Sequence, residues 1–180
     1  ELQQSFVGVL ATTQFINIQD GSSSQVVSST INVGQSFSFD NGGAPYTVNQ
    51  ISVQLMKSAA AHGQDITIQL LDDGWSDASP LASKTINFDK LTTEFGWKTV
   101  NFDDVTLNSN QTYIVRISSN NADGEVFVGY SDSNRWNNSE MIVSGVSNAS
   151  ADLKLLVGYN DGVNIDSVNH VPGPQITGQN

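Results

Sequence analysis

The stretch Tyr46-Thr47-Val48-Asn49-Gln50-Ile51-Ser52-Val53-Gln54-Leu55 carries the clearest structural signal in this chain of 180 residues. In its second half, apolar side chains at positions 51, 53 and 55 alternate with the polar Ser52 and Gln54. Successive side chains of a β-strand point to opposite faces of the sheet. This period of two therefore predicts a strand with one face in a core and the other in water.

The same alternation returns along the rest of the chain. It is found in residues 66–70, 113–117, 126–130 and 153–159, and further strands are predicted over residues 25–29, 32–39, 83–88, 97–102 and 141–146. Clusters of Gly, Asn, Asp and Ser, such as Asp40-Asn41-Gly42-Gly43, separate the strands and predict turns. Roughly ten short strands with this punctuation predict an all-β fold, an antiparallel β-sandwich of jelly-roll type. A single helical turn is expected at 58–61.

The length suits one domain with short tails. We expect a ligand-binding domain over residues 25–162. Residues 1–24 are expected to be a lead segment that can dock a strand on the sandwich. Residues 163–180 are expected to be a linker, because Pro172-Gly173-Pro174 continues neither a helix nor a central strand.

Composition and charge exclude several classes of function. The formal net charge is −11, which disfavours binding to nucleic acid and to anionic membrane surfaces. The chain has no cysteine, so disulfides, thiolate catalysis and cysteine-based zinc sites are excluded. No apolar run approaches the roughly 20 residues of a membrane-spanning helix, so direct membrane insertion is not expected.

The sequence also contains no recognisable catalytic motif. The two histidines are His62 and His170, and His170 lies in the expected linker. The sequence lacks the strand–turn–helix nucleophile motif of Ser–His–Asp hydrolases and the several histidines of many metalloenzymes. Gly42-Gly43 is too short for a phosphate-binding loop. A paired-carboxylate glycosidase remains open, because acidic residues are plentiful, but no pair stands out. The sequence thus predicts a non-catalytic binding module.

A polar loop around Trp136 is the strongest candidate binding site. An exposed Trp can stack on a sugar ring, while Asp132, Asn134, Arg135 and Asn137 can hydrogen-bond its hydroxyls. Arg135 could instead clamp a carboxylate of an acidic sugar or a peptide C-terminus. The structural alternative is that Trp136 caps the end of the sandwich and Arg135 only offsets local acidity.

The other two tryptophans lie in different settings. Trp75 is surrounded by turn residues and could flank the same site, or it could pack over the edge of the core; both alternatives stay open. Trp97 opens a predicted strand.

Acidic side chains near Trp75 suggest a calcium site. Asp72, Asp73 and Asp77 lie in one short Gly-containing loop, and Ca²⁺ prefers oxygen ligands from such loops. The spacing is not that of an EF-hand, and each Asp taken alone is a common turn residue. Four further candidates lie elsewhere: Asp40, Asp132, Asp152 and Asp161. The sequence predicts at least one calcium ion.

Several segments occur in an order that resembles a known kind of module. They are Gln35-Ser36-Phe37, the 46–55 stretch, Ile66-Thr67-Ile68-Gln69-Leu70, Trp97-Lys98-Thr99-Val100-Asn101-Phe102, Tyr113-Ile114-Val115 and Tyr130-Ser131-Asp132. Residues 35–159, about two-thirds of the chain, resemble a jelly-roll module of secreted bacterial proteins, similar in fold to galactose-binding-like and carbohydrate-binding modules. The resemblance implies ligand binding at loop ends or on a concave sheet, often with structural calcium. In similar jelly rolls the position of Trp97 packs inside, so the resemblance also implies that Trp97 lies in the core.

The tail resembles a second kind of module. Gln175-Ile176-Thr177-Gly178-Gln179 is similar to the opening of a cadherin-like repeat of very large secreted bacterial proteins. This resemblance implies an extracellular, monomeric module of a surface adhesin. The leading expected ligand is carbohydrate; the alternatives are a peptide or protein, and a structural spacer without any ligand.

Overall fold

The computed structural model describes residues 12–59, 63, 65–72, 74–76, 79–120 and 125–160. The strands in this part of the chain are β1 (Thr12–Ile18), β2 (Ser23–Val27), β3 (Val33–Ser38), β4 (Tyr46–Lys57), β5 (Ile66–Asp72), β6 (Ala82–Ile86), β7 (Gly96–Leu107), β8 (Thr112–Ser119), β9 (Val126–Ser131), β10 (Ser139–Val143), β11 (Val146–Asn148), β12 (Asp152–Leu153) and β13 (Leu155–Asn160). A short 3₁₀ turn, η1 (Phe88–Lys90), precedes β7.

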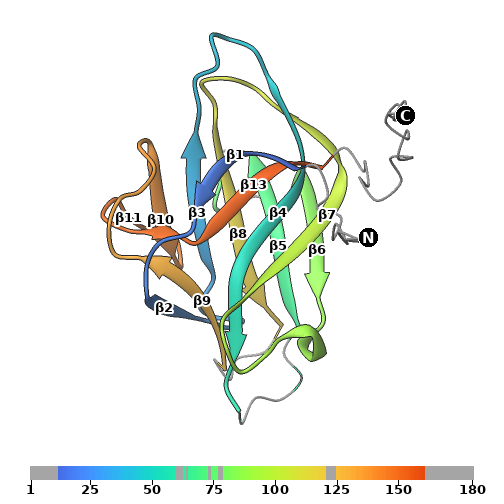
Figure 1. The fold of residues 1–180 in the computed structure, drawn as a ribbon, viewed down its shortest axis with the longest axis vertical. Coiled ribbons are helices and arrows are strands. Elements are labelled where there is room, and N and C mark those ends of the chain that lie inside the picture. The colour runs from blue at the N-terminus through green and yellow to red at the C-terminus, as the bar shows by residue number, and fades with distance from the viewer. Residues whose placement is uncertain are drawn as a thin grey trace, which may run out of the picture.

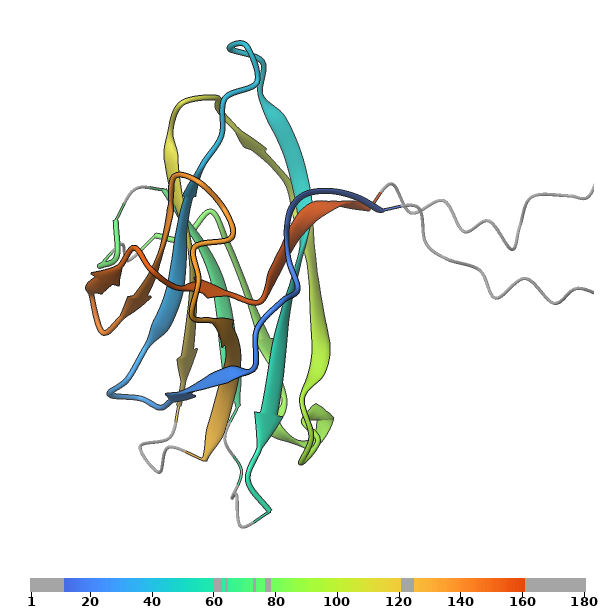
Figure 2. The same ribbon diagram turned by 60° about the vertical axis from the view of Figure 1, so that its left-hand side comes forward.

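The strands form two antiparallel sheets that pack face to face (Figures 1 and 2). The first has the order β1-β13-β4-β9-β12, with β2 paired to β9 and β7 paired to β4. The second has the order β11-β10-β3-β8-β5-β6. The chain changes sheet at almost every step from β3 to β10, as in a jelly roll. The predicted all-β sandwich is thereby confirmed.

The core lies between the sheets, where the alternating apolar positions meet. Val48, Ile51, Val53 and Leu55 of β4 are buried, and Tyr113, Val115 and Ile117 of β8 face them from the other sheet. β4 is central to the first sheet, because it pairs with β7 along one edge and with β13 and then β9 along the other. The stretch with the clearest alternation thus lies in a strand that pairs with three others.

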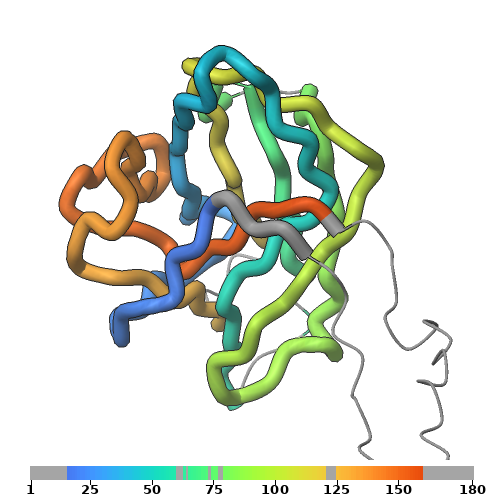
Figure 3. The backbone as a smooth tube through the Cα atoms, turned by 45° about the horizontal axis from the view of Figure 1, so that its top comes forward, coloured from blue at the N-terminus to red at the C-terminus, as the bar shows by residue number. Residues whose placement is uncertain are grey.

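The first described strand packs beside the last. β1 pairs antiparallel with β13, with Thr12 opposite Asn160, so the two ends of the described chain lie side by side (Figure 3). Ile16 and Ile18 of β1 are fully buried in the core. Residues 12–24, expected as a lead segment, therefore supply β1 and the start of β2; Phe6, Val7, Val9 and Leu10, like the expected linker 163–180, lie outside the described residues.

Several strand ends differ from those predicted. β7 continues to Leu107, five residues past the expected end, and the final run is broken at Lys154 into β12 and β13. The predicted 141–146 strand turns at Ser144 and Gly145, which have positive φ angles of 48° and 84°. Ser58 and Ala59 are not helical, and positions 60 and 61 of that expected turn lie outside the described residues.

The prediction that Trp97 lies in the core is wrong. Trp97 is 36% exposed on β7 and stands opposite Gln54 on the outer face of the first sheet. The neighbouring Lys98 is opposite the buried Val53, so the inward positions of β7 begin with Lys98 and Val100. The register of β7 on β4 decides which face the indole takes, and a shift of one residue would reverse it.

Trp75 covers the outer face of the second sheet. It is half-buried against Leu71, Ile114 and Ile142, which form a small apolar cluster on that face. Arg116 donates hydrogen bonds to the Trp75 carbonyl oxygen and, at 2.8 and 3.1 Å, to Gln69 Oε1. The second sheet is therefore packed on both sides near the loop that carries Trp75.

Gly34 makes room for this indole. A Cβ atom at position 34 would lie 2.6 Å from Trp75 Cζ3 and 2.6 Å from the Val115 carbonyl oxygen. We predict that Gly34→Ala lowers the free energy of unfolding by about 1–3 kcal/mol, because overpacking forces side chains or backbone to shift. Urea unfolding followed by tryptophan fluorescence measures this change.

The matched control is Gly96→Ala on β7, where an added Cβ would lie no closer than 3.8 Å to another side chain. We expect that variant to stay within about 0.5 kcal/mol of the original chain. Equal stability of the two variants would contradict the conclusion that the Trp75 indole needs a glycine at position 34.

Candidate functional site

The candidate site is built on one buried carboxylate, that of Asp152. Asp152 begins β12 opposite Ser131 of β9 and is fully buried. Its Oδ1 accepts hydrogen bonds of 2.6 Å from Gln35 Nε2 and lies 2.6 Å from Ser139 Oγ. Its Oδ2 accepts from the backbone N–H groups of Arg135 and, at 3.0 Å, of Trp136. A buried carboxylate needs such donors, because burial without them is costly.

This carboxylate fixes the shape of the loop that joins β9 to β10. Two consecutive backbone N–H groups that point at one anion form the arrangement known as a nest. The Ser139 hydroxyl lies 2.6 Å from both Asp152 Oδ1 and the Trp136 carbonyl oxygen, and its single proton can go to only one of them at a time. Gln35 closes the network, because its Oε1 accepts the Leu153 N–H at 2.7 Å. The backbone at Trp136 is therefore held from both sides.

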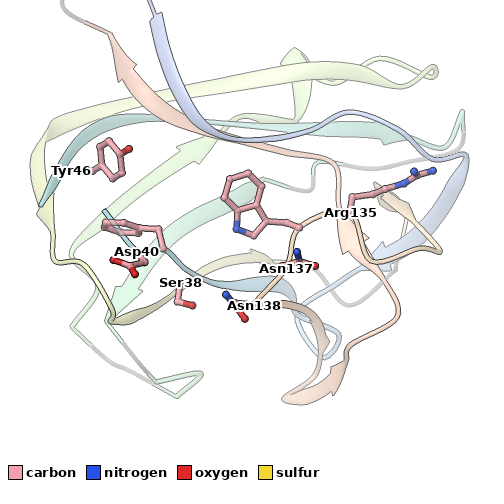
Figure 4. A pocket seen from close by; sticks show the side chains of 8 residues that line it. Ser38, Asp40, Tyr46, Arg135, Asn137 and Asn138 are labelled. Carbon is pink, nitrogen blue, oxygen red and sulfur yellow. The ribbon is translucent and has the colours of Figure 1, made fainter. Parts of the chain in front are cut away.

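Trp136 borders an open pocket of about 410 Å³ at one end of the sandwich, which we call the aromatic pocket (Figure 4). Its lining is Ser38, Phe39, Asp40, Tyr46, Arg135, Trp136, Asn137 and Asn138. Trp136 is half-buried and packs on the core, as does Tyr46. Tyr46 lies on Phe39 with ring centroids 5.0 Å apart and an interplanar angle of 59°. Three aromatic rings thus surround one opening.

The polar groups of the pocket come from two loops. Asp40 follows β3, and its Oδ1 accepts the Gly42 N–H at 2.9 Å, so the carboxylate closes the Gly-rich turn before Tyr46. Asn137 and Asn138 are exposed, and Asn138 has a φ of 64°. The Asn138 carbonyl oxygen accepts the Ser38 N–H at 3.3 Å and joins the two loops. The pocket offers carboxylate, amide and hydroxyl groups beside aromatic faces.

The predicted binding residues separate in the structure. Trp136, Arg135 and Asn137 border the aromatic pocket, but the guanidinium of Arg135 points away from Tyr46 (Figure 4). Arg135 Nε lies 3.4 Å from Ser131 Oγ, to which it donates. Asn134 lines an adjoining hollow instead and donates to the Ala149 carbonyl oxygen at 3.2 Å.

Two predicted residues do not reach this pocket. Asp132 is exposed and accepts a 2.9 Å hydrogen bond from Ser23 Oγ of β2. Trp75 packs on the outer face of the second sheet, whereas Trp136 packs on the core between the sheets. The two indoles therefore do not share a site, and Trp75 corresponds to the packing alternative.

Five lining residues were absent from the predicted ligand-binding residues: Ser38, Phe39, Asp40, Tyr46 and Asn138. Asp40 was considered only as a calcium ligand and a turn former. Phe39 and Tyr46 flank the turn at 40–43, and aromatic residues on both sides of a Gly-rich turn are the signal that could have placed them at the end of the sandwich.

The predicted calcium ligands are only partly described. Asp72 is exposed at the end of β5, while Asp73 and Asp77 lie outside the described residues. Within the described ranges, no group of three or more His, Asp or Glu side chains is placed to hold a metal ion. Asp132 and Asp152 are both engaged by protein donors. The described part of the chain therefore shows no cluster of three acidic side chains at which calcium could be placed.

Comparison with known proteins adds no assignment. No protein-family model matches the sequence, and no curated protein matches it. Within the part of the chain that the structure describes, no helix combines the length and hydropathy of a membrane span.

The Asp152 network gives a stability prediction. Asp152→Asn replaces a charged acceptor by an amide whose NH₂ group would face existing donors. We therefore expect the free energy of unfolding to fall by about 2–3 kcal/mol. Urea unfolding measures the change. The control is Asp132→Asn, because that exposed carboxylate accepts one hydrogen bond, from the Ser23 hydroxyl, and its replacement should shift the free energy of unfolding by about 0.5 kcal/mol or less. If both variants are equally stable, Asp152 does not hold the loop.

Proposed function

We propose that this chain is a non-catalytic module that binds carbohydrate in the aromatic pocket. The observation that carries the proposal is the half-buried Trp136, which borders an open pocket beside Tyr46, Asp40 and Asn137. An aromatic ring stacks on the C–H face of a sugar, and carboxylate and amide groups bind its hydroxyls. The buried network beneath Trp136 supports the proposal, because a site held in advance loses less entropy on binding.

The residues around the pocket favour binding over hydrolysis. A glycosidase of the common kind needs two carboxyl groups that flank the scissile bond. Among the described residues, the lining contains one carboxylate, Asp40, and its Oδ1 already accepts the Gly42 N–H. The proposed role therefore includes no chemical step.

The net charge and the position of Arg135 favour a neutral sugar. At a formal net charge of −11, the protein repels anionic ligands at long range. Arg135 is the cation of the pocket lining, and its guanidinium points away from Tyr46 (Figure 4). The second candidate, a peptide C-terminus clamped by Arg135, would need that side chain to reorient.

The resemblance of residues 35–159 to carbohydrate-binding modules, and of the tail to cadherin-like repeats, supports a place for the module in an extracellular bacterial adhesin. In that role the pocket would attach the parent protein to surface or matrix glycans. A structural spacer is the remaining alternative, and it predicts no saturable binding to any glycan.

The first test is a broad array of neutral and acidic glycans, followed by titration calorimetry with a hit. We predict that Trp136→Ala weakens binding at least tenfold, about 1.4 kcal/mol of binding free energy. A few residues usually carry most of the binding free energy, and these are often aromatic residues near the centre of the site. Asn137→Ala, at an exposed position, should weaken binding several-fold without disturbing the core.

The matched control for the indole is Trp97→Ala, because Trp97 is exposed on the outer face of the first sheet, away from the pocket lining. We expect it to leave binding unchanged. A loss of binding in Trp97→Ala with none in Trp136→Ala would move the site to the sheet face, and a blank array from folded protein would reject the carbohydrate proposal.

Calcium is tested separately. The sequence predicts calcium-dependent binding, whereas the described residues show no cluster of three acidic side chains, so the proposed mechanism contains no step through the metal. If the aromatic pocket alone binds the glycan, titrations with and without EDTA should give the same affinity. A loss of binding in EDTA that is restored by added Ca²⁺ would show that a metal site elsewhere, such as the loop of Asp73 and Asp77, is required.

A further inference from the structure

Two more hollows lie beyond the aromatic pocket. The second, of about 400 Å³, is lined by Ser36, Thr112, Asn134, Asn138, Ser139, Glu140 and Ala149. The third, of about 440 Å³, is lined by Asp72, Asn110, Gln111 and Thr112. Asn138 is shared by the aromatic pocket and the second hollow, and Thr112 is shared by the second and the third. The second hollow is therefore a neighbour of the aromatic pocket and of the third hollow, and together we call the three spaces the groove.

The sheet register fixes the path of the groove. β10, β3, β8 and β5 are neighbours in the second sheet. Glu140 of β10 stands opposite Ser36 of β3, and Ser38 of β3 stands opposite Thr112 of β8. Asp72, at the end of β5, stands opposite the residue after Thr112. The groove thus crosses four adjacent strands, a width of about 14 Å at the usual strand spacing.

The floor of the second hollow belongs to the outer face of that sheet. The third hollow lies at the end of the strands, because Asp72 follows the core-facing Leu70 by two residues and stands opposite the core-facing Tyr113. Gln35 and Phe37 of β3 are fully buried toward the core, so Ser36 and Ser38 face the other way. Tyr113 is buried in the core, and the preceding Thr112 is exposed. A row of small hydroxyl side chains therefore runs outward from the aromatic pocket, with no aromatic or large aliphatic side chain among the described lining residues of the second and third hollows.

Several polar groups along the groove are available to a ligand. In the described part of the chain, the side chains of Asn138, Thr112, Asn110 and Glu140 make no hydrogen bond or ion pair with the protein. Hydroxyl and amide groups that point outward without protein partners are suited to the hydroxyls of a polyol. Carboxylates from Glu140 and Asp72, with the overall acidity, repel an anionic chain.

We propose that the ligand is an extended neutral oligosaccharide, with one residue stacked on Trp136 in the aromatic pocket and the following residues along Asn138, Glu140 and Thr112 toward Asp72. This inference rests on the proposed function and adds to it the class of glycan: a linear chain of several units rather than a single terminal sugar. Continuity with the aromatic pocket gives the chain its anchor, and the hydroxyl and amide lining gives its remaining units hydrogen bonds.

The experiment is a length series measured by titration calorimetry on the full chain. The probes are neutral gluco-, galacto- and manno-oligosaccharides of one to six units. In the series that binds, affinity is expected to rise at least tenfold from one to four units and then to level off. A monosaccharide that binds as tightly as the tetrasaccharide would overturn the groove and leave the proposed function standing, whereas an absence of binding in every series would overturn both.

A blocking variant locates the chain. Thr112→Tyr places a large side chain at an exposed strand position between the second and third hollows, and tyrosine suits a strand. It should lower the affinity of the tetrasaccharide to that of the disaccharide and leave the monosaccharide unaffected. Thr85→Tyr, at an exposed position of β6 outside the groove lining, is the control and should change neither.

A second variant covers the case in which Thr112→Tyr fails to fold. Glu140→Ala removes a carboxylate of the second hollow from a half-buried position and should weaken the tetrasaccharide several-fold while the monosaccharide is unchanged. Equal weakening of both ligands, or none of either, would contradict a chain that passes this point.

Discussion

The buried carboxylate of Asp152 is the constraint on which the end of the sandwich depends. It lies where the last segment leaves β9 and crosses to β4, since β12 pairs with β9 and β13 pairs with β4. At this crossing the regular ladder is interrupted, and backbone N–H groups of the 132–138 loop need acceptors. Asp152 provides them, and Gln35 and Ser139 tie the same carboxylate to β3 and β10. One side chain therefore joins three strands and a loop.

The hydrogen bonds of Asp152 determine where the Trp136 ring lies in the aromatic pocket. Trp136 has an apolar body on the core and a backbone N–H on Asp152, so both its depth and its orientation are restricted. A charge without a counter-ion is tolerated inside a protein only when several donors surround it. The donors here include the consecutive N–H groups of Arg135 and Trp136. The same hydrogen bonds that stabilise the charge of Asp152 therefore also order the loop.

The parts of the fold that follow from period-two alternation could be predicted from the sequence, because burial of one strand face is a local property. β4, β5 and β8 were located in this way. Strand ends and the faces of individual side chains were harder to predict. β7 extends to Leu107. Trp97 faces outward because the register of β7 against β4, a long-range property, decides the direction of its side chain. β1 has alternating Ile16 and Ile18, but its place is set by a partner at the far end of the chain.

The candidate site shows the same division. Trp136 and Asn137 stood out because a large aromatic residue among polar neighbours is visible in one loop. Tyr46 and Phe39 join them only because two loops meet at one end of the sandwich, and that meeting depends on the sheet order. Asp152 was considered as a metal ligand, since sequence does not reveal that protein N–H groups already surround it.

Trp75 and Trp136 illustrate why residue type alone does not assign function. Both lie in polar loops, and both are half-buried. Trp75, however, meets a flat sheet face on which Gly34 leaves a space that its indole fills, and Arg116 binds its carbonyl oxygen. Trp136 meets an opening bordered by Tyr46 and by polar side chains. An indole that covers an apolar sheet face contributes to stability, as Trp75 does. An indole that borders an open pocket can contribute to binding, as we propose for Trp136. The difference comes from the part of the sandwich on which each loop lies.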